Sequence, residues 1–314
     1  MSAPSQASLN RFLTPRYWPL WAGLGIVRLI ILLPWRLQLA LGRGLGRLAH
    51  PFARRERRIA DVNLRLCLPE LSDSERRGLM LRHFESLGCA LVETALVWWG
   101  SERRMQRLVR IEGLEHIERA LAGGHGAILL SAHFTTLEMG ARALTRATRT
   151  AVMYQTPRNP LIAELSLRSR RQLAERVFSS DNVRELLQSL KQNLPVWYAP
   201  DQREEGKSGA MVPFFGVPAS TNIATSRIAQ ISGAPVLTYL PERLRDGTGY
   251  VMRIGPPLPG FPSGDPLADA ARFHAIIEQH VRRCPDQYLW TYKRFKRSDA
   301  LDPYNTRKAD VNQA

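Results

Sequence analysis

Cysteine is scarce in this chain, and the three that occur lie far apart. Cys67, Cys89 and Cys284 form no Cys-x-x-Cys pair, and the seven histidines include no His-Glu-x-x-His spacing. A metal cluster and a disulfide framework are therefore not expected, and the widely spaced cysteines indicate a reducing compartment. We predict a protein with no metal site and no resident cofactor.

Acidic residues are also in short supply. The chain has 28 Asp and Glu against 44 Lys and Arg, which gives a net charge of +16. Such an excess attracts polyanions, namely nucleic acid, an anionic membrane surface or an acidic carrier protein. With 314 residues and 44% hydrophobic content, the chain is large and apolar enough for one α/β domain with an appendage, and global disorder is not expected.

One long apolar run occurs, at residues 17–35, with the sequence YWPLWAGLGIVRLIILLPW. It is close to the length of a membrane-spanning helix, which needs roughly 20 residues, and aromatic residues at both ends are typical of the membrane interface. Arg28, near its middle, would cost about 2.5–3.5 kcal/mol at the centre of a bilayer. We predict a membrane anchor, either a single span or a helix that dips into one leaflet; a buried core helix is the alternative.

Positive charge surrounds this run and is denser on its C-terminal side. Arg36, Arg43 and Arg47 follow it, and then the sequence RRERR at residues 54–58. This asymmetry favours a globular part on the cytoplasmic side. The RRERR run would meet anionic headgroups, where each basic residue contributes about 1 kcal/mol.

Helical and strand patterns alternate after a helical region at residues 51–110. We predict strands at residues 126–132, 151–154, 195–199, 234–240 and 250–254, with helices at 135–148, 160–177, 181–193, 221–232 and 267–283. This alternation predicts an α/β fold with a mostly parallel central sheet flanked by helices, and an N-terminal membrane-anchoring helix. The expected domains are an anchor at 1–50, a helical region at 51–110, a catalytic domain at 111–298 and a frayed polar tail at 299–314.

His133 and Glu138 carry the clearest chemical signal. His133 follows the predicted strand at 126–132, at the edge where α/β folds build their sites, and Glu138 lies in the first turn of the next helix. An imidazole can take a proton from an alcohol near neutral pH, and a carboxylate facing back toward the ring can orient it. The alternative for Glu138 is a capping box with Thr135, which would only begin the helix.

Three further segments offer supporting groups. Arg168, Arg170 and Arg171 lie on one predicted helix, where a single arginine could neutralise a phosphate or an oxyanion, or simply face solvent. Asp201 follows the predicted strand at 195–199. The apolar sequence VPFFGVP at 212–218 could line a groove for an acyl chain or belong to the core, and residues 288–297 interleave aromatic and basic side chains, a pattern that suits single-stranded nucleic acid or a membrane interface.

Together these segments resemble the lysophospholipid acyltransferase superfamily, which has a glycerolipid acyltransferase-like fold, and within it the late lauroyl and myristoyl transferases of lipid A biosynthesis. The resemblance runs in family order over residues 15–297. It rests on PRYW (15–18), NLRLCLPE (63–70), HFESLG (83–88), EHI (115–117), HFTTLE (133–138), NPL (159–161), VWYAPD (196–201), VPFFG (212–216), AST (219–221), QYLW (287–290) and RFK (294–296).

The resemblance implies an enzyme of the bacterial inner membrane that faces the cytoplasm. It would move a fatty acyl group from acyl carrier protein to a hydroxyl on a hydroxyacyl chain of a Kdo-bearing, phosphorylated lipid A precursor. His133 and Glu138 match the family's catalytic pair, and the stretches that match the family predict a set of substrate-binding residues: Asn159, Arg170, Asp201, Phe214, Gly216 and Thr221. Partners would be the carrier protein, the lipid and an anionic membrane, without nucleic acid.

One departure and two alternatives remain. Family members commonly have Tyr-Arg-Pro where this chain has Tyr154-Gln155-Thr156-Pro157, which puts acceptor detail in question but not the class of reaction. A related enzyme with another membrane lipid as acceptor would carry the same His-Glu pair. A basic nucleic-acid-binding protein would explain the charge but not the anchor together with the His-Glu strand end.

Overall fold

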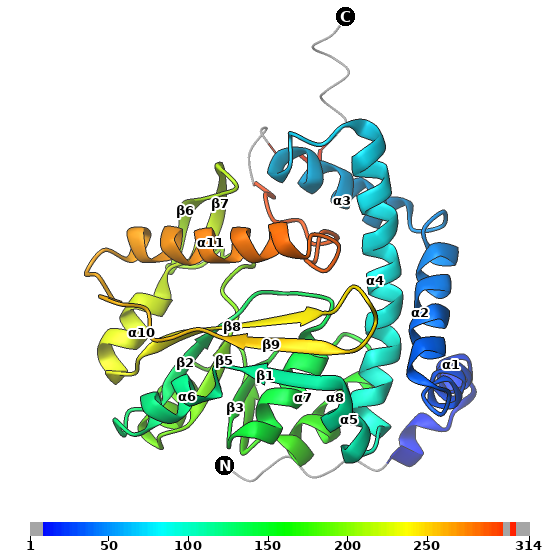
Figure 1. The fold of residues 1–314 in the computed structure, drawn as a ribbon, viewed down its shortest axis with the longest axis horizontal. Helices are drawn as coiled ribbons and strands as arrows, with labels where there is room; N and C mark the ends of the chain where they lie inside the picture. Colours follow the sequence, from blue (N-terminus) through cyan, green and yellow to red (C-terminus); the bar gives the residue numbers. More distant parts are fainter. Residues whose placement is uncertain (1–8, 298–301, 306–314) are drawn as a thin grey trace, which may run out of the picture.

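A seven-stranded sheet forms the centre of the molecule in the computed structural model, which describes residues 9–297 and 302–305 (Figure 1). The strand order is β1-β9-β8-β2-β5-β3-β4. Every neighbouring pair is parallel except β8 and β9, so the predicted mostly parallel sheet is confirmed. The strands are β1 (Val109–Glu112), β2 (Ala127–Leu130), β3 (Ala151–Tyr154), β4 (Arg176–Ser179), β5 (Pro195–Tyr198), β8 (Val236–Arg243) and β9 (Tyr250–Ile254).

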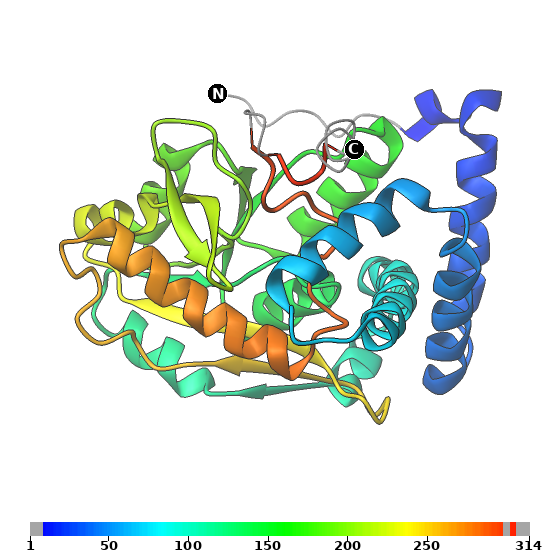
Figure 2. The same cartoon turned by 90° about the horizontal axis from the view of Figure 1, so that it is seen from above.

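Helices cover both faces of this sheet, as Figures 1 and 2 show. α6 (Leu114–Leu121), α7 (Leu137–Ala147) and α8 (Pro160–Leu173) follow β1, β2 and β3; α9 (Val183–Lys191), α10 (Ala224–Ser232) and α11 (Pro266–Arg283) come later in the chain. β2 explains why both faces need a cover. Ile128 and Leu130 point into one apolar core, while Ala127 and Leu129 point into the other, as expected for a strand buried on both sides.

A helical layer packs against one end of the sheet. It consists of α1 (Trp18–Ile30), α2 (Trp35–Ala49), α3 (Arg54–Cys67), α4 (Asp73–Trp99) and α5 (Glu102–Leu108), after two short 3-10 turns, Leu9–Phe12 and Pro15–Tyr17. α4 joins the two cores, since Leu79 and Phe84 lie in one and Val92 and Leu96 in the other. Ser72 begins α4 with a capping box to Glu75.

Three glycines hold α2 against α4. A Cβ on Gly42 or Gly46 would collide with the backbone of α4, and a Cβ on Gly88 would collide with the backbone of α2. Small residues four apart let two helix backbones approach closely, as in small-xxx-small contacts. The two helices therefore run side by side along their lengths (Figure 1).

The apolar run at residues 17–35 does not form one helix. α1 ends at Ile30, and a turn leads to Pro34, which precedes the first residue of α2. Proline disfavours helical backbone in the residue before it, so the helix predicted across the whole run is wrong in this respect. No helix among the described residues has both the length and the apolar character needed to cross a bilayer. Arg28 stacks over Trp99, 5.3 Å from the ring centroid.

Several predicted boundaries were wrong. The helix expected at 160–177 ends at Leu173, because the chain then enters β4 at the edge of the sheet. The apolar sequence at 212–218 is part of an antiparallel hairpin, β6 (Gly209–Phe214) and β7 (Val217–Asn222). Thr221, the first residue of the helix predicted at 221–232, belongs to β7, and α10 begins at Ala224. The expected frayed tail lies largely outside the described residues, but Tyr304 is buried and its hydroxyl donates to Asn63 of α3.

Candidate functional site

His133 lies just beyond the carboxyl end of β2, and Asp201 lies just beyond the carboxyl end of β5. β2 and β5 are parallel neighbours in the sheet, so the two segments that follow them meet at one edge. The His133 ring nitrogen Nδ1 lies 2.6 Å from Oδ1 of Asp201, and the His133 backbone N–H donates to the other carboxylate oxygen at 2.9 Å. One carboxylate thus holds both the ring and the backbone of His133.

The charges of this pair stabilise each other. Burial by itself would lower the pKa of His133, but the negative charge of Asp201 and the hydrogen bond to it raise the pKa above its usual value. Burial would raise the pKa of Asp201, yet His133 and its hydrogen bonds keep that pKa below its usual value. Asp201 is 2% exposed and the His133 side chain 26%. Asp201 therefore stays ionised and fixes Nδ1 as the donor, which leaves Nε2 as the nitrogen that can accept a proton.

A segment near the C-terminus fixes the loop that carries His133. The Tyr288 hydroxyl donates to Asp201 at 3.2 Å, and the Leu289 N–H donates to the His133 carbonyl at 3.0 Å. From the other side, the Thr135 hydroxyl is 2.7 Å from that of Ser86 on α4. These contacts hold the imidazole from three separate parts of the chain, which limits its motion before any substrate arrives.

Glu138 has a different partner from the one the sequence suggested. Its carboxylate accepts a hydrogen bond from Arg170 of α8 at 2.5 Å, and Arg170 also lies over the ring of Tyr154. The ring of His133 is oriented by Asp201, so the expectation that Glu138 holds this ring is wrong. The capping-box alternative is also wrong, because α7 has no side-chain cap and Thr135 bonds to Ser86 instead.

An apolar cavity of about 480 Å³ opens beside the Glu138–Arg170 pair. Its wall comes from α1, α4, α7 and α8, four helices that are far apart in the sequence. The side chains are mainly apolar or small, and the ion pair supplies the charge. The lining residues are Leu20, Gly23, Leu24, Val27, Leu91, Thr94, Ala95, Trp98, Trp99, Glu138, Pro157, Ile162, Ser166 and Arg170.

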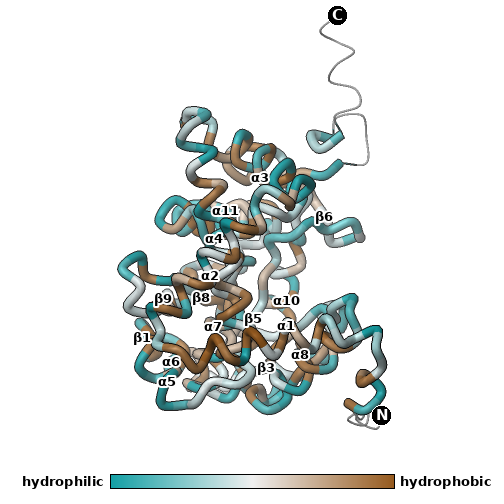
Figure 3. The backbone as a smooth tube through the Cα atoms, turned by 90° about the vertical axis from the view of Figure 1, so that its right-hand side faces the viewer, coloured by the Kyte–Doolittle hydropathy of each residue, from teal (hydrophilic) through white to brown (hydrophobic). Residues whose placement is uncertain are grey.

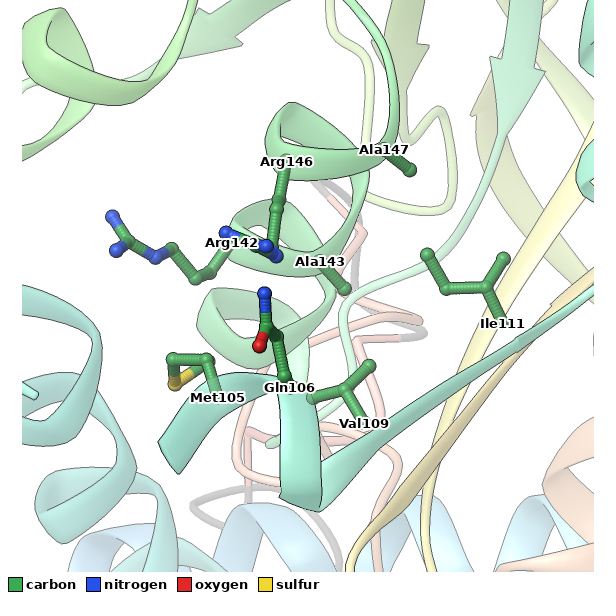
Figure 4. A pocket seen from close by; sticks show the side chains of 8 residues that line it. All are labelled: Met105, Gln106, Val109, Ile111, Arg142, Ala143, Arg146 and Ala147. Carbon is green, nitrogen blue, oxygen red and sulfur yellow. The ribbon is translucent and has the colours of Figure 1, made fainter. Parts of the chain in front are cut away.

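A second cavity, of about 190 Å³, lies between α5, β1 and α7 (Figure 4). Arg142 and Arg146 of α7 line it together with Met105 and Val109. Both arginines form ion pairs with Glu102. Each guanidinium group therefore already has a carboxylate partner, and we assign no chemistry to this cavity.

The other predicted substrate-binding residues have structural contacts. The Asn159 side chain accepts from the backbone N–H groups of Leu161 and Ile162, at 3.0 and 3.3 Å, and so begins the helix that carries Arg170. Phe214 is buried among aromatic rings, including that of Tyr288.

The remaining two predicted residues lie in the β6–β7 hairpin. Gly216 forms its exposed turn, where both central residues, Phe215 and Gly216, have positive φ. The Thr221 hydroxyl is buried and accepts from Arg294 at 2.7 Å. These contacts give Phe214 and Thr221 partners within the protein and place Gly216 in a turn; that the three residues bind substrate stays a prediction.

Sequence reasoning missed Tyr288, and it left Asp201 without its connection to His133. Tyr288 belongs to the QYLW stretch at 287–290 and to the aromatic and basic segment at 288–297, neither of which was assigned to the site of His133. The signal for Asp201 was stronger, because a carboxylate after a predicted strand lies at the same edge as His133. Only the strand order, with β5 next to β2, brings it to the ring.

The sequence profile of the bacterial lipid A biosynthesis acyltransferases matches residues 6–297 of this chain. A lipid A biosynthesis lauroyltransferase of Escherichia coli strain K12 is 36% identical over 285 residues, which cover 90% of this chain and 93% of that protein. The chain belongs to the bacterial lipid A biosynthesis acyltransferase family. A palmitoleoyltransferase of the same strain is 37% identical (91% and 94% covered), and a myristoyltransferase is 27% identical (93% and 92% covered).

Membership in this acyltransferase family confirms the resemblance seen in the sequence and fits the site. A buried carboxylate that orients a histidine is an arrangement for taking a proton from a hydroxyl. The cavity beside Glu138 and Arg170 has a mostly apolar wall, as is common for ligand sites.

Proposed function

We propose that this acyltransferase moves a fatty acyl chain from the thioester of acyl carrier protein to a hydroxyl on a hydroxyacyl chain of a Kdo-bearing lipid A precursor. The observation that carries the proposal is the His133–Asp201 pair at the carboxyl ends of two adjacent strands. Its family membership supports lipid A as the acceptor. The net charge of +16 suits both an acidic carrier protein and a phosphorylated lipid.

In the proposed reaction His133 acts as the general base. Its Nε2 takes the proton of the acceptor hydroxyl, while Asp201 stabilises the imidazolium that forms. The hydroxyl oxygen bonds to the thioester carbonyl carbon, and the negative charge moves to the carbonyl oxygen. Arg170, held in place by Glu138, supplies positive charge for this oxyanion. When the carbon–sulfur bond breaks, the proton on His133 passes to the thiolate, so all protons are accounted for.

The cavity beside Arg170 is the proposed place for an acyl chain. Its volume of about 480 Å³ falls within the range of about 300–1,000 Å³ that is usual for ligand sites. Its wall is mostly apolar, and the Glu138–Arg170 ion pair in that wall contains the arginine assigned to the oxyanion. A chain bound there would have its carbonyl end near that charge.

Membrane attachment is proposed through α1 and α2. Exposed apolar side chains concentrate on this part of the molecule, among them Trp18, Ile26, Leu29 and Leu48, and most of α1 has the colour of hydrophobic residues in Figure 3. A helix that lies in the interface plane needs exposed apolar side chains on one face and basic residues beside them. The arginines after residue 35 favour the cytoplasmic face of the inner membrane.

The test is mass spectrometry of lipid A after membranes containing the protein are incubated with acyl carrier protein thioesters and the tetra-acylated precursor. We expect a mass gain of one acyl group. His133→Ala should reduce the initial rate about 10²–10⁴-fold, because it removes general-base catalysis. His125→Ala is the matched control, since His125 is exposed and should retain the full rate.

Two results would count against this proposal. Full activity of His133→Ala in the membrane fraction would exclude the proton transfer described above. A lack of any mass gain, with thioesters of every chain length tested, would show that the acceptor is another membrane lipid.

A further inference from the structure

A cluster of arginines surrounds His50 where α2, α3 and α4 meet. We call Arg54, Arg57, Arg58 and Arg77 the basic corner; Figure 1 shows this region at the end of α4 beside α3. Two adjoining cavities, of about 420 and 300 Å³, share Arg54 and Arg58 in their walls. Lys293 adds a further positive charge to the second cavity.

The arginines of the basic corner have no carboxylate partner among the described residues. Within residues 9–297 and 302–305, none of its four arginines forms an ion pair. Among the described residues in the wall of the two cavities, Asp61 is the one carboxylate, and it already pairs with Arg65 and Arg76 at 2.9 and 3.6 Å.

Two details of the basic corner favour the binding of an anion. The Nε of Arg57 is buried and has no hydrogen-bond acceptor. Burial and the charge of Arg57 both lower the pKa of His50. Like charges three and four residues apart on a helix repel each other, so an anion bound here would relieve that repulsion and complete the hydrogen bonding of Arg57.

An exposed apolar row leads directly to the basic corner. Leu37, Leu41, Leu45 and Leu48 follow one another at helical spacing along α2 and are exposed, as is Phe52 in the turn before α3. Leu48 is 65% exposed and Phe52 79%. These side chains flank His50 in the sequence, so apolar surface borders the cationic cavities. An acidic protein would neutralise the arginines but would leave this row in water.

The corner is separate from the acyl cavity. Both are lined by α4, but Arg77 contributes to the corner and Leu91 to the cavity. Fourteen residues of α-helix separate them, which at ~1.5 Å per residue is about 21 Å. A group bound at the corner would therefore not occupy the proposed acyl site.

We propose that the basic corner binds the phosphate of an anionic phospholipid headgroup while Leu48 and Phe52 insert among the neighbouring acyl chains. Guanidinium groups recognise phosphate oxygens through charge-assisted hydrogen bonds. The inference rests on the membrane attachment proposed above and adds a defined binding site to it. α2 would then lie along the membrane surface, with the headgroup fixed at its C-terminal end.

The test is co-sedimentation of the purified full chain with vesicles of phosphatidylcholine alone or with one third phosphatidylglycerol. We expect tight binding to the mixed vesicles, a loss of affinity of at least 10-fold in Arg57→Gln/Arg58→Gln, and less than a two-fold change in Arg103→Gln/Arg107→Gln. Arg103 and Arg107 lie on α5 and are exposed, so this control removes the same charge at another place. A thermal unfolding midpoint at or above the parent value shows that the corner variant is folded.

Each other outcome has a distinct meaning. Equal losses in the two double variants would show attraction by net charge alone and overturn the site, as would unchanged binding by the corner variant. Retained vesicle binding with lost affinity for acyl carrier protein would assign the corner to the protein partner and also overturn it. Full competition by millimolar inorganic phosphate would identify a site for free phosphate rather than lipid. Transferase rates in detergent test the proposed reaction independently of all these results.

Discussion

At the scale of single residues, the ionised carboxylate of Asp201 decides the chemistry of His133. We predict that Asp201→Asn lowers kcat/KM about 10²–10⁴-fold. The general base must be neutral, so activity rises with pH through the pKa of His133. Asp201 raises that pKa against the effect of burial, and without its charge the acidic limb of the pH–kcat/KM profile should move to lower pH.

Glu138→Gln provides the contrast, because Glu138 pairs with Arg170 rather than with His133. We expect this variant to lose activity about 10-fold to 100-fold, in keeping with the ~1.5–3 kcal/mol of a charge-assisted hydrogen bond, while its acidic limb stays in place. Full pH profiles of both variants and the parent enzyme provide the measurement. An acidic limb that moves with Glu138→Gln and not with Asp201→Asn would return the orienting role to Glu138.

At the scale of secondary-structure elements, the contact of α2 with α4 depends on the absence of side chains. A Cβ at Gly46 would collide with the carbonyl of Phe84, so Gly46→Leu must push the two helices apart. We predict a loss of about 1–3 kcal/mol or more in the free energy of unfolding, as for other overpacked interiors. Thermal and denaturant unfolding of the detergent-solubilised protein measure it.

Gly44→Ala is the matched control on the same helix. Its Cβ would meet nothing within 4 Å, and alanine favours a helix interior over glycine by roughly 0.5–1 kcal/mol. This variant should therefore be as stable as the parent or slightly more so. Equal destabilisation by Gly44→Ala and Gly46→Leu would show that helix propensity, rather than close packing, governs this region.

At the scale of the whole molecule, the proposed acyl cavity depends on the packing of α1 against α4, because α1 supplies part of the cavity wall. Gly23 of α1 lines it, and a Cβ there would meet nothing within 4 Å. A leucine at this position would therefore fill part of the cavity without straining the backbone. We predict that Gly23→Leu shifts the preferred donor toward shorter acyl chains, measured as relative rates with thioesters of different length.

Gly25→Leu is the control, since Gly25 is also free of contacts but does not line the cavity. Its chain-length preference should match that of the parent enzyme. If the Gly23→Leu variant is folded and its chain-length preference is also unchanged, the acyl chain binds elsewhere on the protein.

The sequence by itself determined the class of fold and the position of His133, the proposed general base. β9 was predicted with its observed bounds, and β2 and β5 to within a few residues, because buried parallel strands are short apolar runs that end abruptly. His133 was found for the same reason, since it follows such a run. Helix ends such as that of α8 were less certain, because β4 has few apolar residues to distinguish it from the helix before it.

Only the tertiary structure decided which carboxylate serves His133. Glu138 is near in sequence, whereas Asp201 is 68 residues away and reaches the ring because β5 pairs with β2. The same holds for Tyr288, for the acyl cavity and for the basic corner, each of which joins segments far apart in the chain. Local sequence patterns indicate which residues are buried and with what spacing. Strand order and helix packing depend instead on burying all the apolar faces at the same time.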